Sequence, residues 1–353
     1  MIRTLFCLFI WVCMALPESA HADWIRYAMV VGYNHSDDDA LQSLRYADDD
    51  AVKHAQLLSL TTSKTVLLTD LDAESRRMYP ELLVAQPTRA NVLSELRMLR
   101  KRMQKDVANG DKPVLYFVYS GHGNYDALGR GYVHLRDGRF TTQDIYYEVL
   151  GPTNGSSPHH VVLIVDACNA ALLVNSRGSD RRRANRASLK LESYPNVGVI
   201  LSSSSVGEVH EWGRLLSGIF SHEVRSGLLG PADVDDDGTV TFAELAAFVP
   251  SANMEVKNEI YRLKPYIRPP LSAPNLPLLE QQNTRFRARI RVSSAVHGRA
   301  YLMNSELLRY ADFHKDNAHE FWLGIPGDDG FILVHGNDEY VVPAGASGDL
   351  QVS

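Results

Sequence analysis

Two residues of this chain carry the side chains that cysteine-dependent hydrolysis needs, a thiol and an imidazole. Cys168 follows the apolar run VVLIVDA, and His122 follows the run VLYFVYSG, 46 residues upstream. A thiol beside an imidazole is an activated nucleophile with a neighbouring base. A cysteine or histidine that only fills the core is expected in the middle of such a run rather than at its end. We therefore predict a catalytic pair.

Glycines flank the predicted base on both sides. Gly121 and Gly123 let the chain turn sharply and let a substrate approach the backbone. The N–H groups of Gly123 and Cys168 are the predicted hydrogen-bond donors to the oxyanion that forms when a carbonyl carbon is attacked.

The runs that lead to this pair belong to an alternating series of strands and helices. Because the predicted strands are apolar throughout, they are typical of a parallel sheet that is covered on both faces. Ligands of such sheets bind at the carboxyl ends of the strands, which is where both residues fall. The predicted strands are Tyr27–Gly32, Thr65–Thr69, Val114–Ser120, Val161–Asp166 and Val197–Ser202, and the predicted helices are Asp38–Leu60, Thr88–Val107 and Thr141–Val149.

Residues 1–22 have the pattern of a secretory signal peptide. Arg3 gives a basic start, Thr4–Leu16 is uncharged and apolar, and Ala20-His21-Ala22 is a small-x-small cleavage site. The apolar stretch is shorter than the roughly 20 residues that a membrane helix needs. A retained anchor is the alternative, and Val12 argues against lipid attachment at Cys13. We expect an exported protein, periplasmic or secreted, with no stable membrane anchor.

Removal of this segment would also remove Cys7 and Cys13 and leave Cys168 as the single cysteine. Oxidising compartments favour disulfides, but a lone cysteine cannot form one within its own chain. The alternative to a nucleophile is a small buried apolar residue. The remaining 331 residues suit one large domain and a smaller one. The formal net charge of −6 gives no indication of a nucleic-acid partner.

The motifs around the pair resemble those of caspase-type cysteine peptidases, most closely the metacaspase and paracaspase branch and its bacterial relatives. The resemblance rests on YSGHG, on DAC, on RYADDDA at Arg45–Ala51, and on Ser202–Gly230, which is similar to the family's small-subunit segment. It covers about Trp24 to Leu271. It implies an α/β, caspase-hemoglobinase-like fold, with a mostly parallel sheet and helices on both faces. It also implies peptide-bond hydrolysis, with Cys168 as nucleophile and His122 as general base and acid.

One departure from the family pattern follows the predicted nucleophile. This chain has Asn169-Ala170-Ala171 where family members often have Ser-Gly or Gly after the residue that follows the cysteine. The departure keeps open a caspase-like pseudoenzyme that acts as a calcium-dependent protein-binding module. A different cysteine hydrolase or transpeptidase on a related fold is the third function class.

The resemblance places the substrate pocket at three acidic positions, Asp50, Asp166 and Glu211. Carboxylates in a cleft attract a cationic side chain, and an arginine can pair with one of them in bidentate fashion. We therefore expect a polypeptide substrate with arginine or lysine at the cleavage site. In the alternative reading, Asp50 complements the dipole of a helix start and Glu211 is a surface charge.

A second motif, Asp233–Glu244, has the spacing of an EF-hand calcium loop. Acidic residues occupy loop positions 1, 3, 5 and 12, and a glycine occupies position 6. The alternative is an Asp-rich turn before a capped helix. We expect Ca²⁺ in a structural or activating role, held by Asp233, Asp235, Asp237, Thr239 and Glu244.

The segment Asn175–Leu189 is polar, rich in arginine and without apolar periodicity, which indicates a solvated loop. It occupies the region where caspase-type enzymes are cut between their large and small segments. An enzyme that cleaves after basic residues would meet this loop at high effective concentration. The candidate sites of self-cleavage are Arg181, Arg182, Arg183 and Arg186.

The chain changes character after Leu271. We divide the chain after the signal peptide into a peptidase domain (23–271), a proline-rich linker (272–285) and a small β-rich region (286–353). Short alternating segments such as Arg287–Val292, Phe331–Val334 and Tyr340–Val342 indicate the strands of this last region. It contains no motif with chemistry of its own, which leaves a binding module and an inhibitory flap as the alternatives for its role.

Overall fold

The computed structural model describes residues 24–38, 41–151, 159–174, 191–202, 211–252, 254, 263, 265–315, 319–327 and 329–352. The predicted signal peptide and the arginines of the predicted self-cleavage segment lie outside the described residues. No helix among the described residues is long and apolar enough to cross a membrane.

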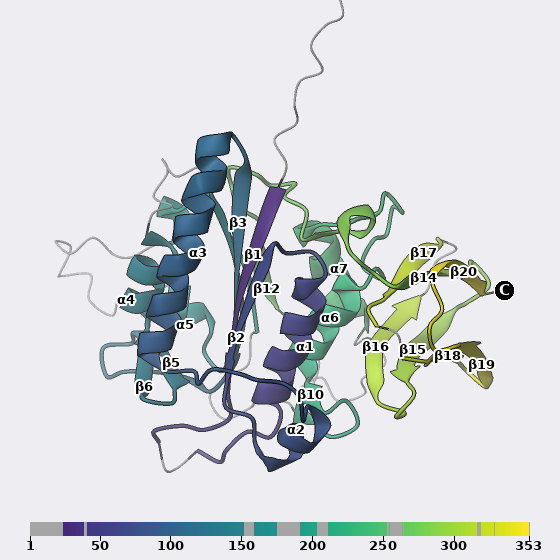
Figure 1. Ribbon diagram of the computed structural model, residues 1–353, viewed down its shortest axis with the longest axis horizontal. Coiled ribbons are helices and arrows are strands. Elements are labelled where there is room, and N and C mark those ends of the chain that lie inside the picture. Colours follow the sequence, from purple (N-terminus) through teal and green to yellow (C-terminus); the bar gives the residue numbers. More distant parts are fainter. Residues whose placement is uncertain are drawn as a thin grey trace, which may run out of the picture.

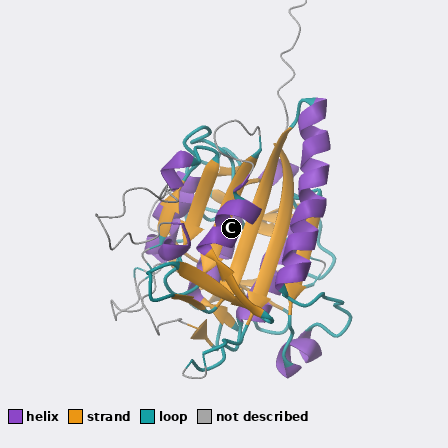
Figure 2. Cartoon of the chain, turned by 90° about the vertical axis from the view of Figure 1, so that its left-hand side faces the viewer, coloured by secondary structure: helices purple, strands orange, loops and turns teal. Residues whose placement is uncertain are grey.

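A six-stranded sheet with the strand order β12-β8-β7-β3-β1-β2 forms the centre of the molecule (Figures 1 and 2). Its strands are parallel except for β12 (Tyr266–Arg268), an antiparallel edge strand that the sequence analysis missed. The five predicted strands are confirmed as β1 (Trp24–Tyr33), β2 (Lys64–Thr69), β3 (Lys112–Gly121), β7 (His160–Asp166) and β8 (Val197–Leu201).

Alternate side chains of the sheet pack into two separate cores because successive residues of a strand point to opposite faces. In β1, Met29 and Val31 face one core, while Ala28 and Val30 face the other. The first core is covered by α3 (Arg89–Asn109). The second is covered by α1 (Ala47–Ser59), α6 (Ile219–Leu228) and α7 (Phe242–Ala252), as Figure 1 shows.

Helix α1 begins nine residues later than the sequence pattern indicated, at Ala47 instead of Asp38. The carboxylate of Glu211 accepts hydrogen bonds from the backbone N–H groups of Arg45 and Tyr46, just before the helix. A residue 165 positions away thus satisfies N–H groups at the helix start, and a local pattern does not reveal such a contact.

Short elements complete this part of the chain, and several of them were not predicted. The predicted helix at 141–149 is instead a short α-helical turn followed by a π-helical turn, Ile145–Val149. The further elements are α2 (Ala73–Met78), β4 (Gly123–Tyr125), β5 (Gly131–Leu135), β6 (Gly138–Thr141), α4 (Thr142–Asp144), α5 (Ala171–Val174), the 3-10 turn Leu191–Ser193, β9 (Glu211–Trp212), β10 (Ser217–Gly218) and β11 (Thr239–Val240).

The expected linker at 272–285 packs on the peptidase domain. Leu276, Leu278 and Leu279 are almost completely buried. Strand β13 (Leu279–Glu280) pairs with β11 and is followed by a 3-10 turn, Gln281–Asn283. The side chain of Arg26 also donates a hydrogen bond of 2.6 Å to Glu280. The proline-rich segment is therefore packed against the peptidase domain, and the expectation of an extended linker is wrong.

The predicted β-rich region at the C-terminus is confirmed, and we call it the C-terminal module. Its strands form a three-stranded sheet, β17-β14-β20, and a four-stranded sheet, β16-β15-β18-β19. Its buried side chains belong to the same core as those of α6 and α7, so it packs against the helices on that face of the central sheet (Figure 1). Its strands are β14 (Ala288–Val292), β15 (Gly298–Asn304), β16 (Arg309–Lys315), β17 (Phe321–Ile325), β18 (Phe331–His335), β19 (Asp338–Val342) and β20 (Gly348–Val352).

Candidate active site

The register of the central sheet brings the two predicted catalytic segments together. Strands β3 and β7 are parallel neighbours in which Ser120 pairs with Asp166. His122 and Cys168 each lie two residues beyond that pair. A Cβ atom on Gly123 would lie 2.3 Å from the carbonyl oxygen of Cys168, so the two segments also touch beyond the strands. The structure therefore places His122, Gly123 and Cys168 at one edge, at the carboxyl ends of the strands.

The environment of His122 favours the neutral form of its imidazole. Its side chain is buried, and burial lowers its pKa from the ordinary histidine range, although the backbone carbonyls of Gln42 and Asn34 partly oppose this shift. Its Nε2 atom has no hydrogen-bond partner among the described residues. A neutral ring nitrogen of this kind can take a proton from a thiol.

A second histidine that the sequence analysis missed lies behind the first. The ring of His134 packs edge-on against His122, with centroids 6.2 Å apart. Its Nδ1 atom lies 2.8 Å from a carboxylate oxygen of Asp37. His134 belongs to no catalytic motif in the sequence. The contact between the two histidine rings arises only because β5, which carries His134, folds back on β4.

Cys168 is buried and is not part of a disulfide. The next residue, Asn169, has a φ of 57°, in the left-handed region. Asparagine adopts this conformation more readily than most residues other than glycine. Ala170, which follows, is completely buried. The segment that departs from the family pattern thus contains residues that suit the sharp turn after Cys168.

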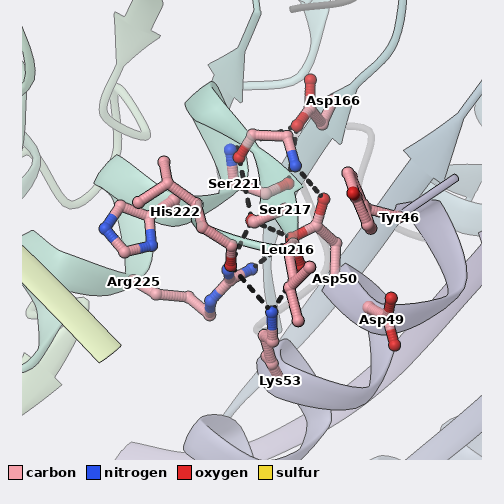
Figure 3. A network of polar contacts seen from close by, with 12 residues as sticks. Tyr46, Asp49, Asp50, Lys53, Asp166, Leu216, Ser217, Ser221, His222 and Arg225 are labelled. Carbon is pink, nitrogen blue, oxygen red and sulfur yellow. Dashed lines mark hydrogen bonds and ion pairs between the residues drawn. The ribbon is translucent and has the colours of Figure 1, made fainter. Parts of the chain in front are cut away.

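Two of the three predicted substrate-binding carboxylates, Asp50 and Asp166, lie close together near this edge (Figure 3), and Glu211 is near enough to Asp50 to feel its charge. Together with Gly218 we call these three residues the acidic pocket. Asp50 comes from the first turn of α1, Asp166 ends β7, and Glu211 begins β9. A Cβ atom on Gly218 would lie 2.8 Å from Oδ2 of Asp166 and 3.1 Å from Oδ2 of Asp50. Glycine is needed here because the backbone passes between two carboxylates.

Asp50 is enclosed by partners within the chain. Its side chain is about 1% exposed and accepts hydrogen bonds from the hydroxyl of Ser217 and, at 2.7 Å, from the Gly218 N–H. It also accepts one of 3.0 Å from the guanidinium of Arg225. The predicted substrate contact is thus already paired with a buried cation.

Asp166 and Glu211 are more accessible than Asp50, since both are partly exposed. Asp166 accepts hydrogen bonds from the N–H and the hydroxyl of Ser221, at 3.1 and 2.7 Å. Burial, together with the charge of Asp50, raises the pKa of Asp166 to about 7. Burial also raises the pKa of Glu211. A cation that enters the pocket would favour the ionised form of both groups.

Four residues that hold the pocket were not predicted: Lys53, Ser217, Ser221 and Arg225. The ammonium of Lys53 donates to the carbonyl oxygens of Leu215 and Leu216, at 3.2 and 2.5 Å. The spacing of Ser221 and Arg225 in α6 could have shown that they share a helix face. Nothing in the local sequence says that this face meets the pocket.

The predicted calcium loop folds around its own carboxylates. Oxygen atoms of Asp233, Asp235 and Asp237 all lie within 4.8 Å of one another. Backbone N–H groups of Asp237 and Gly238 donate to Asp233. Burial and the neighbouring acidic charges raise the pKa of Asp233 to about 6, and a divalent cation would relieve that repulsion. These residues therefore fit Ca²⁺.

The other two predicted ligands have different contacts. Glu244 does not belong to the group of three carboxylates. One of its oxygens accepts a hydrogen bond from the N–H of Thr241 at the start of α7. The other accepts from the N–H of Val234 at 3.3 Å. Thr239 donates its N–H to Asp237. Their role as ligands stays a prediction.

The comparisons with known proteins give one family match and several distant structural likenesses. The family model described as the caspase domain matches residues 25–264. Among solved structures, pro-Sf-caspase-1 is 14% identical, with a TM-score of 0.41, and the match covers 71% of this chain and 94% of that one. For caspase-1 from Spodoptera frugiperda the identity is 13%, the TM-score 0.41 and the shares 72% and 93%. The Arg-specific cysteine proteinase gingipain R is 10% identical, with a TM-score of 0.31, and the shares are 92% and 65%.

These structural likenesses are too distant to assign residues or substrates to this chain. No curated protein matched it. The family match, which spans more than half of the chain, carries the classification.

Proposed function

Because this chain belongs to the caspase-domain family of cysteine peptidases, we propose that it is an endopeptidase that cleaves polypeptides after arginine or lysine. One observation supports the specificity above all others: carboxylates of Asp166 and Asp50 flank Gly218, next to the strand end that carries Cys168. A substrate cation in this pocket lies beside the nucleophile, and it meets a partly exposed carboxylate at Asp166.

The proposed reaction starts with transfer of the thiol proton of Cys168 to the neutral ring of His122. The thiolate sulfur then attacks the carbonyl carbon of the scissile bond, and the N–H groups of Gly123 and Cys168 stabilise the oxyanion. His122 returns the proton to the departing amine, which leaves a thioester on Cys168. Water, activated by the same ring, hydrolyses the thioester and restores the thiol.

The pocket favours a basic side chain through charge. A guanidinium or ammonium group supplies a positive charge to carboxylates that are poorly solvated, whereas a neutral side chain leaves their charge without a substrate cation and an acidic one repels them. The partly exposed carboxylates of Asp166 and Glu211 are the groups that a substrate can reach.

Calcium belongs to the same proposal as a structural or activating ion. The loop at 233–244 follows α6 and ends in the first turn of α7, and Arg291 of the C-terminal module makes two hydrogen bonds of 2.6 Å to Asp236 within it. An ion held by Asp233, Asp235 and Asp237 would therefore stabilise a junction of α6, α7 and the module. Export and cleavage within Arg181–Arg186 rest on the sequence alone.

The test is a set of fluorogenic peptides that differ only in the residue before the scissile bond: arginine, lysine, citrulline or aspartate. Citrulline has nearly the shape of arginine without its charge, so it separates charge from fit. We expect turnover of the arginine and lysine peptides with calcium present, and none by Cys168→Ala. Hydrolysis of the aspartate peptide in preference to arginine would contradict the specificity. Absence of any Cys168-dependent hydrolysis would favour the binding-module alternative.

A further inference from the structure

Helix α6 lies between the acidic pocket and the C-terminal module, with polar side chains on both sides. Toward the pocket, Ser221 donates to Asp166 and Arg225 donates to Asp50 (Figure 3). The position of this helix therefore sets the position of two carboxylates.

The opposite contacts of α6 are made with strand β16 of the module. Nε2 of His222 lies 2.9 Å from a carboxylate oxygen of Asp312, and both side chains are almost completely buried. The backbone N–H of Asp312 donates to the hydroxyl of Ser226 at 3.0 Å. Arg309 and Arg299 donate to the other oxygen of Asp312. Asp312 thus fixes α6 to the module through a satisfied polar network.

Arg225 connects α6 to β10 (Ser217–Gly218), which we call the pocket wall. The residue is buried, with about 4% of its surface exposed. Its guanidinium donates to Asp50 at 3.0 Å and to the hydroxyl of Ser217 at 2.8 Å. Ser217 and Gly218 form β10, the backbone that passes between the carboxylates. Lys53 holds the residues just before β10 through their carbonyl oxygens.

A cavity adjoins the two cations that hold β10. Lys53 and Arg225 line this cavity of about 480 Å³ together with residues of the C-terminal module, among them Arg309, Tyr310 and Phe331. The ion pair between Arg225 and Asp50, with the hydrogen bond of Arg225 to Ser217, therefore ties β10 to α6 beside this cavity.

We propose that Arg225 is a positioning residue for the specificity pocket, and that the C-terminal module sets its position by holding α6 through Asp312. On this view Asp50 anchors the pocket wall, and Asp166 and Glu211 remain as the carboxylates that meet the substrate. Because it presupposes a basic substrate side chain, this role rests on the proposed function.

The charge of Arg225 also favours the ionised form of Asp166. The charged groups that act on Asp166 are Asp50 of α1, which raises its pKa, and Arg225 of α6, which lowers it. Without Arg225, the charge of Asp50 would act on Asp166 with less compensation, and the pKa of Asp166 would rise. Binding of a cation would then require a higher pH.

The experiment follows binding of a cation to the pocket as a function of pH, and its midpoint is the pH at which binding is half-maximal. One arm uses peptide kinetics with active enzyme, and the other uses ligand binding to an inactive variant. Arginine and citrulline peptides give kcat and KM for active-site-titrated enzyme. Benzamidine, an aromatic amidinium cation, is titrated by calorimetry into the Cys168→Ala protein and reports on the pocket alone. Failure of the proposed function appears as absent hydrolysis, whereas the benzamidine titration still tests the role of Arg225.

For Arg225→Met we expect KM for the arginine peptide to rise by about tenfold at neutral pH, with kcat within about threefold of wild type. The midpoint for benzamidine binding should move upward by about one pH unit. Adding Asp50→Asn should move it back, because the uncompensated charge is removed. Arg225→Lys keeps the positive charge, so its pH midpoint for benzamidine binding should stay close to that of the wild-type pocket.

Asp312→Asn should raise KM for the arginine peptide in the same direction by a smaller factor, and Asp349→Asn should not. Asp349 is a matched control because it is an exposed carboxylate of the same module, paired with Arg289. A folded Arg225→Met protein with a wild-type midpoint and a wild-type ratio of arginine to citrulline turnover would overturn the role. If that variant does not fold, a wild-type KM in Asp312→Asn overturns the part assigned to the module.

Discussion

The proposed catalytic pair and the acidic pocket lie at the same edge of one sheet, yet the chain builds them in different ways. His122 and Cys168 are each delivered by a single strand, and the pairing of Ser120 with Asp166 suffices to bring them together. The pocket takes its carboxylates from α1, β7 and β9 and its counter-charges from α1 and α6. The proposed catalytic pair is thus visible in sequence motifs, while the proposed specificity pocket is built from contacts between distant elements.

The two regions also treat charge differently. His122 is kept neutral by burial, so it is ready to accept a proton. In the pocket, one carboxylate is paired internally with Arg225, and a second, Asp166, is held near its midpoint of ionisation at neutral pH. We therefore expect substitutions at the pair to remove the reaction and substitutions in the pocket to change which substrates are used.

The largest effect is expected at the pair itself. Cys168→Ala and His122→Ala should each lower kcat by about 10³-fold or more, because one removes the nucleophile and the other its base. His160→Ala is a matched control, since this partly buried histidine starts β7 at the opposite end of the strand. Active-site-normalised hydrolysis with circular dichroism of each variant checks this. Substantial turnover by either folded variant would break the assignment.

Asp166→Asn should separate the pocket from the pair. Loss of the charged hydrogen bond should lower kcat/KM for an arginine peptide by about 10- to 100-fold. The citrulline peptide should be affected much less, because it carries no charge. Paired kinetics with the two peptides measure this. Equal losses for both would mean that Asp166 serves the reaction or the fold instead of specificity.

The pH dependence should sharpen the same comparison. The pKa of Asp166 is raised to about 7, so the group is protonated below that pH and ionised above it. The ratio of kcat/KM for arginine over citrulline should therefore rise severalfold as pH increases through about 7. The titration of His122, whose pKa is lowered, acts on both peptides and cancels in the ratio. A ratio that is flat across neutral pH would show that Asp166 does not meet the substrate cation.

The smallest expected effect concerns the calcium loop, which lies apart from both regions. Ca²⁺ should raise the midpoint of thermal unfolding by a few degrees, because a ligand of the native state stabilises it by mass action. Asp233→Asn should reduce this shift, while Asp349→Asn should leave it unchanged. Differential scanning fluorimetry with calcium or a chelator measures both. Identical midpoints for wild type under the two conditions would remove calcium from the account.

The sequence predicts those parts of the structure that depend on local order. Apolar runs located the five parallel strands, and the motifs located the pair at their ends. It did not predict the late start of α1, which depends on Glu211, or the antiparallel strand β12. It also did not predict Arg225 and Asp312, because an arginine in a helix and an aspartate in a strand become meaningful only when α6 is packed between pocket and module.

The central claim is that Cys168 is a nucleophile served by a pocket for basic side chains. Peptidyl chloromethyl ketones that end in arginine or in aspartate test both parts in one measurement. Their terminal side chain must fit the pocket, and their reactive group then alkylates the nucleophile that lies beside it. Intact-mass spectrometry followed by peptide mapping should show one adduct, on Cys168, from the arginine reagent and little from the aspartate reagent. Labelling by the aspartate reagent in preference, or an adduct on another residue in the native protein, would contradict the account.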